Sequence, residues 1–364
     1  AAGGPVQVVG KVPDFDLPAI DLSHLTSEEA ECEALSQIAE VSRRPYNLDT
    51  DSLVRPRLFR FPEDQHRLYL AMHHLAFDGV SLVRVLMPEL ATLYEAFSEG
   101  RPSPLPDPPV RYVDYACWEQ EWIASPKAER RLNYWVDRLS RDRDLDIPLD
   151  HERSEEPHLG GGAIPLSLPS DQVERLREAG RDTDVTLFQV LAAAWSLLLS
   201  RYASREEVVF ATAADLRQRP ELHHLFGCCL TPLVMQIDVA ADLAFTDLMR
   251  RTRNELLDGL DHLVPFERVA RRLPPSETRA GNPVYQTMIV LEPAAERRDC
   301  AWSLLPIEPK LIDAVRTFKL DLELQLHEQA DDHLVGQLIY DRDLFETSTA
   351  RGIIEYLLTI CAAV

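Results

Sequence analysis

The stretch that decides the fold is Met72-His73-His74-Leu75-Ala76-Phe77-Asp78-Gly79. It continues an apolar alternation that predicts a strand over residues 67–72. Because neighbouring side chains on a strand point to opposite faces, only His74 of the two histidines shares the face of Leu70 and Met72. Asp78-Gly79 is a tight-turn dipeptide in which the glycine allows a close backbone approach. The stretch therefore predicts a strand, a turn and then the start of a helix.

This pattern places His74 close to the start of a helix, an arrangement suited to acyl transfer. A neutral imidazole accepts a proton at neutral pH, and the free N–H groups of a helix start stabilise developing negative charge. No Cys, Glu or second His lies at ligand spacing on the same face, so a metal site is not expected. The alternative is a pair of core histidines beside a structural aspartate, and the octapeptide alone leaves both readings open.

Composition narrows the class of protein. The chain has 364 residues, which is enough for two lobes or one large domain. Its net charge of −22 argues against nucleic acid or an anionic membrane as the main partner. There is no apolar run of about 18 residues and no basic, apolar start, so we expect neither a membrane span nor a signal peptide. A cytoplasmic protein is the expectation.

The cysteines indicate reduced thiols and no metal motif. None of the six forms a C-x-x-C pair. Cys228-Cys229 lies in an apolar run, which predicts that both side chains belong to the core.

The remaining pattern alternates strands with helices. A capping residue, Ser27, is expected to open the first helix, and Pro88 is expected to kink or break the second. The proline-rich segment 101–109 predicts a surface loop, and 145–162, closing in Gly160-Gly161-Gly162, is the best linker candidate. The expected helices cover 27–44, 81–97, 111–139, 170–203 and 245–260, and the expected strands 56–61, 67–72, 207–212, 230–239, 284–291, 318–327 and 333–340. The fold class is therefore α/β in two halves, with a boundary near 150–160.

Several motifs resemble those of condensation domains of non-ribosomal peptide synthetases. Residues 73–79 match the family's H-H-x-x-x-D-G motif. Tyr112 to Trp118, followed by Tyr134-Trp135, is similar to its "YxDYAxW … YW" signature. Weaker likenesses follow in the family's order at 186–188, 198–202, 265–267, 282–286 and 343–345. The resemblance runs from end to end of the chain.

The resemblance implies two chloramphenicol-acetyltransferase-like lobes in a V-shaped pseudo-dimer, with the site at their junction. Residues 1–154 would form the N-lobe, which carries the histidine motif, and 155–364 the C-lobe. The family's segments upstream of a strand like 5–9 have no counterpart here. The N-lobe is therefore expected to lack its first elements.

The implied function is that of an acyltransferase in secondary metabolite biosynthesis. It would move the acyl group of a donor carrier-protein thioester to an acceptor carrier-bound amine, forming a peptide bond. No cofactor would bind directly, because the substrates arrive on the 4'-phosphopantetheine arms of the donor and acceptor peptidyl carrier proteins. Adjacent adenylation and carrier domains of a synthetase are the other implied partners, with no nucleic acid and no membrane.

The resemblance also implies a role for each site residue. His74 would orient or deprotonate the acceptor amine, and Gly79 would leave room for pantetheine or donate its N–H to the oxyanion. His73 would pack within the core. Asp78 would hold the loop through an ion pair, with Arg217 as its partner. Asp78 would then point away from the tunnel that the substrates enter.

Two departures from the family pattern concern the C-lobe. The usual "PVxGR" is replaced by residues 213–217, which keep only the arginine, and the usual "GFFVNT" becomes Gly227-Cys228-Cys229-Leu230-Thr231-Pro232. These changes affect the expected substrate tunnel and leave the histidine motif intact.

Two alternatives remain, one within this family and one beyond it. An ester-forming or free-standing condensation enzyme would use a hydroxyl acceptor at the same His74. Epimerisation domains share the histidine motif but carry a later "EGHGRE" segment that is absent here, and cyclisation domains replace the motif with paired aspartates. A non-catalytic carrier-docking or recruitment module is disfavoured because the second histidine and the glycine are both present. The substrates and their stereochemistry are not readable from the sequence.

Overall fold

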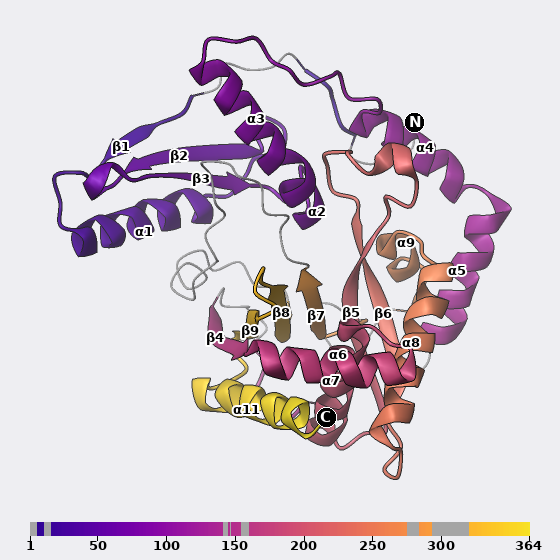
Figure 1. Ribbon diagram of the computed structural model, residues 1–364. Coiled ribbons are helices and arrows are strands. Elements are labelled where there is room, and N and C mark those ends of the chain that lie inside the picture. The colour runs from indigo at the N-terminus through magenta and orange to yellow at the C-terminus, as the bar shows by residue number, and fades with distance from the viewer. Residues whose placement is uncertain are drawn as a thin grey trace. The chain divides into compact units, whose positions relative to one another are not determined.

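The structure, a computed structural model, describes residues 6–10, 16–140, 145, 147–153, 160–274, 284–292 and 320–364. It divides into two compact units, residues 1–73 and residues 74–364 (Figure 1). Each unit has its own β-sheet, and each is described by itself.

The described residues of the first unit form a three-stranded sheet with one long helix and a short 3-10 helix. Its elements are β1 (Ala19–Asp21), α1 (Ser27–Arg43), β2 (Val54–Arg60), the short helix η1 (Pro62–Asp64) and β3 (His66–Met72). β2 lies in the middle, parallel to β1 and antiparallel to β3. The residues that join α1 to the sheet in a small apolar core are Leu22, Ala30, Ala34, Phe59 and Phe61.

The cap of α1 is Thr26, so the expectation of Ser27 was wrong by one residue. The Thr26 hydroxyl accepts a hydrogen bond from the backbone N–H of Glu29, and the Glu29 carboxylate accepts one from Thr26 N–H. This reciprocal pair is a capping box, and it satisfies two donors that the helix start leaves open.

The second unit is built on a six-stranded mixed sheet. Its first elements are α2 (Gly79–Ser81), the π-helical turn η2 (Leu82–Leu86), α3 (Met87–Ser98), α4 (Tyr112–Ile123) and α5 (Pro126–Leu139). Then follow β4 (Gly161–Leu168), α6 (Ser170–Thr183), α7 (Leu187–Ala203), β5 (Glu207–Asp215), η3 (Pro220–Leu222), β6 (Leu230–Asp238), α8 (Phe245–Asp261) and α9 (Phe266–Ala270). The last are β7 (Thr287–Glu292), β8 (Leu322–Glu328), β9 (Leu334–Asp341) and α11 (Thr347–Ala363).

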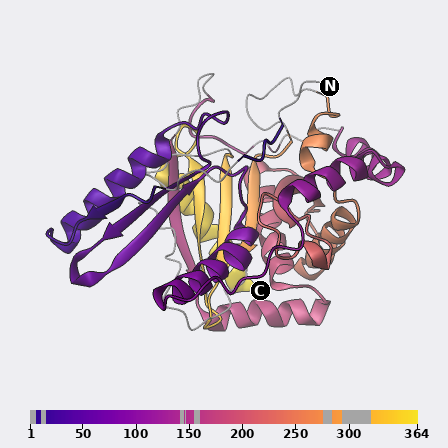
Figure 2. The same cartoon turned by 90° about the horizontal axis from the view of Figure 1, so that it is seen from above.

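The strand order of this sheet is β4-β9-β8-β7-β5-β6. β7 runs parallel to both β5 and β8, while the other neighbours are antiparallel. Figure 2 views the sheet from above, with β8 and β9 in yellow. Since β5, β7 and β8 run in the same direction, their C-terminal ends lie at the same end of the sheet. The residues of the candidate site lie at this end of the sheet.

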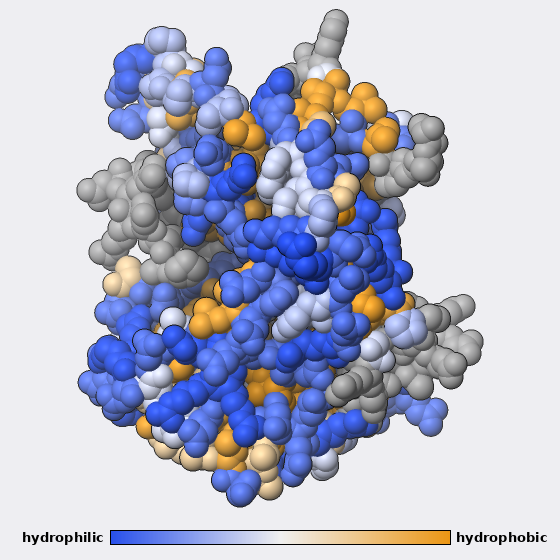
Figure 3. Space-filling model, turned by 90° about the vertical axis from the view of Figure 1, so that its right-hand side faces the viewer, coloured by the Kyte–Doolittle hydropathy of each residue, from blue (hydrophilic) through white to orange (hydrophobic). Residues whose placement is uncertain are grey.

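The core of the second unit is centred on α7. This helix packs on β5 and β7 and lies against α6, α8 and α11. It is buried on nearly every side, and Trp195 is fully buried. Among the described residues no single helix is long and apolar enough to cross a membrane; only α6 and α7 together pass such a test, and they are bent by 97°. Hydrophilic residues cover most of the face shown in Figure 3, as the net charge of −22 leads one to expect.

The sequence predicted most of these elements to within a few residues. Pro88 lies in the first turn of α3, directly after the π-helical turn, so the hydrogen-bond pattern changes there while the backbone at Leu86 and Met87 stays helical. The proline lacks an N–H for the helical ladder, and the wider turn accommodates this loss. The α/β class is confirmed by the two mixed sheets and their helices.

The glycines expected to close a linker belong partly to a strand. Gly161 begins β4, and Gly162 pairs with Tyr340 of β9. A Cβ at Gly162 would lie 2.4 Å from the Tyr340 ring, so the close approach of that ring requires glycine.

The compact units do not coincide with the expected lobes, 1–154 and 155–364. Helix α5 contributes Leu132, Trp135 and Leu139 to the core of the second sheet, so the chain from His74 onward packs with the C-terminal half. The expected boundary between 154 and 155 lies outside the described residues and stays a prediction.

Candidate functional site

The two histidines of the motif fall on opposite sides of the division between the units. β3 ends at Met72, so His74 lies in a turn beyond the strand, and the alternation of a strand does not extend to it. His73 N–H donates to the Leu53 carbonyl at 2.9 Å, and its ring meets Tyr46 edge to face at 5.4 Å. His74 is exposed and stacks on Phe77, with ring centroids 5.5 Å apart. His73 thus packs in the first unit while His74 faces outward in the second.

Asp78 is the N-terminal cap of α2 rather than the corner of a tight turn. Its carboxylate accepts a hydrogen bond from Ser81 N–H at 2.8 Å, and Ser81 Oγ accepts one from Asp78 N–H at 3.0 Å. The side chain of Asp78 is fully buried. It also accepts a hydrogen bond from the backbone N–H of Cys229 at 2.7 Å, which ties the helix start to the residue directly before β6.

Arg217 is brought into direct contact with Asp78. Arg217 Nη1 donates to Asp78 Oδ2 at 2.8 Å and Nη2 donates to Oδ1 at 3.1 Å, so the pair is bidentate. The guanidinium also donates to the carbonyls of Leu225 and Gly227. Both side chains are fully buried, and such a pair repays its desolvation only when its remaining hydrogen bonds are made. Here they are made.

The charge state of Asp78 follows from these partners. Burial by itself raises the pKa of the carboxyl, but the hydrogen bonds from Arg217, Ser81 and Cys229 outweigh burial. The pKa of Asp78 is therefore held below its usual value, and the carboxylate is ionised at neutral pH.

Gly227 and Tyr112 fix the backbone next to this pair. Gly227 has φ +153°, and a Cβ there would lie 2.1 Å from the Tyr112 ring. The Tyr112 hydroxyl donates to the Cys228 carbonyl at 2.9 Å. Burial raises the pKa of Tyr112, so the phenol keeps the proton that it donates. The Cys228 backbone is thus fixed by the hydrogen bond from Tyr112 to its carbonyl and by the packing of the Tyr112 ring against Gly227.

The vicinal cysteines have different surroundings. Cys229 is buried with Tyr115 and Leu225, as the sequence predicted. Cys228 is only half-buried, and its Sγ lies 3.6 Å from His74 Nδ1, so the prediction that it belongs to the core was wrong. One indication of this difference is present in the sequence, because Cys228-Cys229 replaces the Phe-Phe pair of the family's usual "GFFVNT".

The contact between Cys228 and His74 bears on the imidazole's tautomer. Burial raises the pKa of the Cys228 thiol, which is therefore protonated at neutral pH. When Nδ1 of His74 carries the proton, its N–H is directed at the sulfur and Nε2 keeps its lone pair. In that tautomer Nε2 is the basic nitrogen, whereas an S–H donated by the protonated thiol to Nδ1 would leave the imidazole proton on Nε2.

Glu292 and His327 form a second histidine-containing pair, which the sequence did not indicate. Glu292 ends β7, and His327 is its register partner on β8. Glu292 Oε2 lies 3.1 Å from His327 Nδ1. Oε1 of the same carboxylate lies 3.4 Å from where a Cβ at Gly79 would stand. Only the neighbouring strands of the folded sheet bring these residues together, since they are 35 positions apart.

Gly79 is not required by its backbone conformation, because its φ does not fall in the left-handed region. What distinguishes it is the nearby Glu292 carboxylate. Among the described residues no three His, Cys, Asp or Glu side chains are grouped as metal ligands would be. The expectation that no metal binds at His74 stays a prediction.

Comparison with known proteins places the chain in a family. The model of the family described as "Condensation domain" matches residues 1–364. The chain belongs to the condensation-domain family. The resemblance inferred from the motifs is thereby confirmed, and condensation domains are acyltransferase-type components of non-ribosomal peptide synthetases.

The curated relatives of this condensation domain are large synthetases. Chondramide synthase cmdD of Chondromyces crocatus is 33% identical over 100% of this chain and 9% of its own length. Tyrocidine synthase 2 of Brevibacillus parabrevis is 28% identical over 96% of this chain and 10% of its own length. The chain thus spans no more than a tenth of either relative.

Solved structures share the fold of this condensation domain. The X-domain in complex with OxyB from teicoplanin biosynthesis has a TM-score of 0.82 and 26% identity, covering 98% of this chain and 78% of that chain. The first condensation domain of the calcium-dependent antibiotic synthetase has a TM-score of 0.77 and 21% identity, covering 95% and 74%. The epimerization domain of tyrocidine synthetase B has a TM-score of 0.77 and 19% identity, covering 97% and 81%. The predicted chloramphenicol-acetyltransferase-like fold class is confirmed.

Proposed function

We propose that this condensation domain transfers the acyl group of a donor carrier-protein thioester to the amine of an acceptor on a second carrier protein, forming an amide. The observation that carries the proposal is the setting of His74. It is exposed in a turn directly before a buried, fully hydrogen-bonded ion pair, and its Nδ1 faces the sulfur of Cys228. The pair fixes the turn, and in the tautomer that donates Nδ1–H to the sulfur, Nε2 is the nitrogen that would meet substrate.

In the proposed reaction the acceptor amine attacks the thioester carbonyl. His74 Nε2 orients the amine and takes a proton from it as the carbon–nitrogen bond forms. Gly79 gives the pantetheine arm room, and its N–H belongs to the group at a helix start that has no partner within the helix. Collapse of the tetrahedral intermediate expels the pantetheine thiol of the donor.

Asp78 and Arg217 have a structural role in this proposal. The Asp78 carboxylate is turned into the protein and occupied by Arg217, Ser81 and Cys229. It therefore does not oppose the negative charge that develops on the oxyanion.

The partners in this proposal are a donor and an acceptor peptidyl carrier protein, each with a 4'-phosphopantetheine arm. Adenylation and further carrier domains would adjoin them in a synthetase. Support comes from the relatives, which are synthetases many times longer than this chain. No cofactor bound to the domain itself is part of the proposal.

Two alternatives make different predictions. A hydroxyl acceptor at the same His74 would give an ester. A recruitment module would bind another protein without catalysis, and the likeness to an X-domain solved in complex with OxyB favours this second alternative specifically.

Product analysis tests the proposal. Donor- and acceptor-loaded carrier proteins are mixed with the domain, and the acceptor is examined by mass spectrometry for the condensed product. We expect amide product with wild type, and loss of turnover by roughly 10²- to 10⁴-fold in His74→Ala, the usual contribution of a general acid or base. His223→Ala, at an exposed position outside the site, is the matched control.

Full activity in a folded His74→Ala variant would contradict the role of His74. Ester product only with hydroxyacyl acceptors would support the first alternative. Absence of product with every matched pair of carriers would support recruitment.

A further inference from the structure

Glu292 and His327 form a pair at the end of the sheet where the parallel strands β5, β7 and β8 finish. The two residues are register partners on parallel strands, so their side chains project from the same face of the sheet. Their side chains are 45% and 36% exposed, which leaves both within reach of a substrate. Figure 1 shows α2, which begins at Gly79, above the end of β7.

The Glu292 carboxylate has one oxygen engaged and one directed at the site. Oε2 contacts His327 Nδ1, and Oε1 faces Gly79. Among the described residues His327 is its ion-pair partner, while Arg217, the guanidinium beside Asp78, is committed to Asp78 and Asp215. Oε1 is therefore a hydrogen-bond acceptor of negative charge beside the helix start that follows His74.

Amide formation requires the removal of two protons from the acceptor. An α-amino group has a pKa of about 8 and arrives at neutral pH mainly as ammonium, which is not a nucleophile. One proton must leave before attack, and the second must leave the nitrogen of the tetrahedral intermediate. His74 supplies one proton acceptor, and a second would let the acceptor react from its dominant ammonium form.

We propose that Glu292 binds the ammonium of the acceptor through Oε1 and that His327 accepts the first proton. With Nδ1–H donated to Glu292 Oε2, the lone pair of His327 lies on Nε2, and the carboxylate stabilises the imidazolium that forms. The first step converts ammonium and imidazole into amine and imidazolium. The second proton passes from the intermediate to His74 and then to solvent, and the imidazolium returns the first proton to the departing pantetheine thiolate.

This inference rests on the proposed function and narrows it to one acceptor class. A hydroxyl acceptor carries no positive charge and has no ammonium proton to lose. A carboxylate at this place therefore favours an amine over a hydroxyl acceptor of the same shape.

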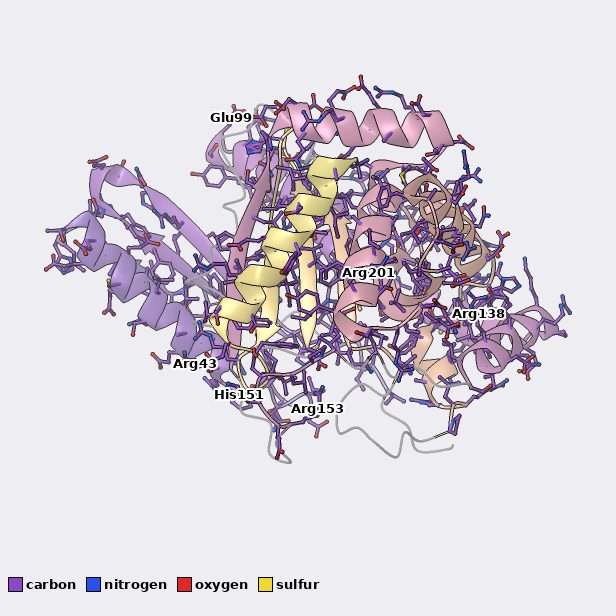
Figure 4. The ribbon with its side chains drawn as sticks, turned by 90° about the horizontal axis from the view of Figure 1, so that it is seen from below. Arg43, Glu99, Arg138, His151, Arg153 and Arg201 are labelled. Carbon is purple, nitrogen blue, oxygen red and sulfur yellow. The ribbon has the colours of Figure 1, made fainter. Side chains whose placement is uncertain are left out.

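Binding tests the inference without turnover. The probes are the alanyl amide of N-acetylethylenediamine, which carries an ammonium and mimics pantetheine-bound alanine, and its lactoyl counterpart, which carries a hydroxyl. Titration by NMR gives Kd for each with wild type, Glu292→Gln and Glu346→Gln. The last variant breaks the exposed His151–Glu346 pair, 3.0 Å apart and beyond the opposite edge of the sheet; Figure 4 labels His151.

We expect wild type and Glu346→Gln to bind the alanyl probe about 10- to 100-fold more tightly than the lactoyl probe, the range of one charge-assisted hydrogen bond. Glu292→Gln should abolish the difference. Equal binding of the two probes by wild type, no binding of either, or a preference that survives in Glu292→Gln would each overturn the inference.

Kinetics separate the two roles. With an aminoacyl acceptor, Glu292→Gln should mainly raise KM and His327→Gln should mainly lower kcat. An unchanged kcat in folded His327→Gln would remove the proton-transfer role. If the alanyl probe binds in a Glu292-dependent way while no product forms, the proposed function fails and the ammonium site stands.

Discussion

Asp78 and Arg217 lie 139 positions apart in the chain and form a bidentate ion pair in which both side chains are fully buried. The pair joins the helix start after the histidine motif to the segment that follows β5. Its further hydrogen bonds reach Cys229 and Gly227, on either side of the residue that contacts His74. The geometry around His74 therefore depends on one buried electrostatic contact.

Removal of one partner should destabilise the protein strongly. Asp78→Ala leaves the Arg217 guanidinium buried without its counter-ion, and we expect a loss of about 3–5 kcal/mol in the free energy of unfolding. Asp247→Ala, which breaks the exposed Asp247–Arg250 pair, should cost less than about 1 kcal/mol. Urea unfolding measures both, and equal losses would contradict this account.

The pH dependence of stability should carry the signature of Asp78. Its pKa is lowered in the folded protein from the ordinary value of 3.8, so its contribution is present above that value and is lost as the pH falls through the folded pKa. The difference in unfolding free energy between wild type and Asp78→Asn should stay constant from about pH 7 to pH 5 and shrink below about pH 4. A difference that is unchanged at pH 3 would show that the carboxylate charge does not stabilise the fold.

Cys228 should influence turnover through His74. Cys228→Ala removes the sulfur 3.6 Å from His74 Nδ1, and we expect kcat to fall by about 3- to 10-fold, the range of one hydrogen bond. Cys228→Ser keeps an acceptor at the same place and should lose less. The nitrogen-15 shifts of His74 check the cause, because the Ala variant should show a larger share of the Nε2–H tautomer. Identical shifts in the three proteins would rule out a role in tautomer choice.

Two neighbouring glycines should respond differently to the same substitution. Gly162→Ala places a Cβ 2.4 Å from the Tyr340 ring and should cost about 1–3 kcal/mol through overpacking. Gly160→Ala meets its nearest atom, Arg342 Cβ, at 3.8 Å, and should change stability by less than about 0.5 kcal/mol. Thermal or urea unfolding of both variants gives the comparison, and equal effects would refute the packing argument.

The sequence predicted those elements whose pattern is local. Periodic apolar residues marked α1, α7 and α8, and the alternation before His73 marked β3. β4 was missed because its first glycines were interpreted as the end of a linker over 145–162, and the strand also contains Pro165. Its place at the edge of the sheet is what allows a proline, and an edge position is settled by tertiary pairing.

The candidate site was predictable only in part. The histidine motif and the Asp78–Arg217 pair were indicated by resemblance to a family. Strand parity was carried two residues past the predicted end of the strand to His74, which lies in a turn where that alternation no longer holds. The contacts of Cys228 with His74 and of Glu292 with His327 arise from the packing of distant segments, for which one sequence holds no local signal.

The Tyr112 ring occupies the space that a side chain at residue 227 would fill. Positions 112 and 227 are therefore not free to vary independently. A Cβ at 227 would be strained at φ +153° whatever the space around it, and a smaller side chain at 112 would relieve only the clash while losing the phenol that donates to the Cys228 carbonyl. Gly227 and Tyr112 should therefore be inherited together, because a side chain at 227 meets both the ring and the backbone strain, and a smaller residue at 112 loses a hydrogen bond.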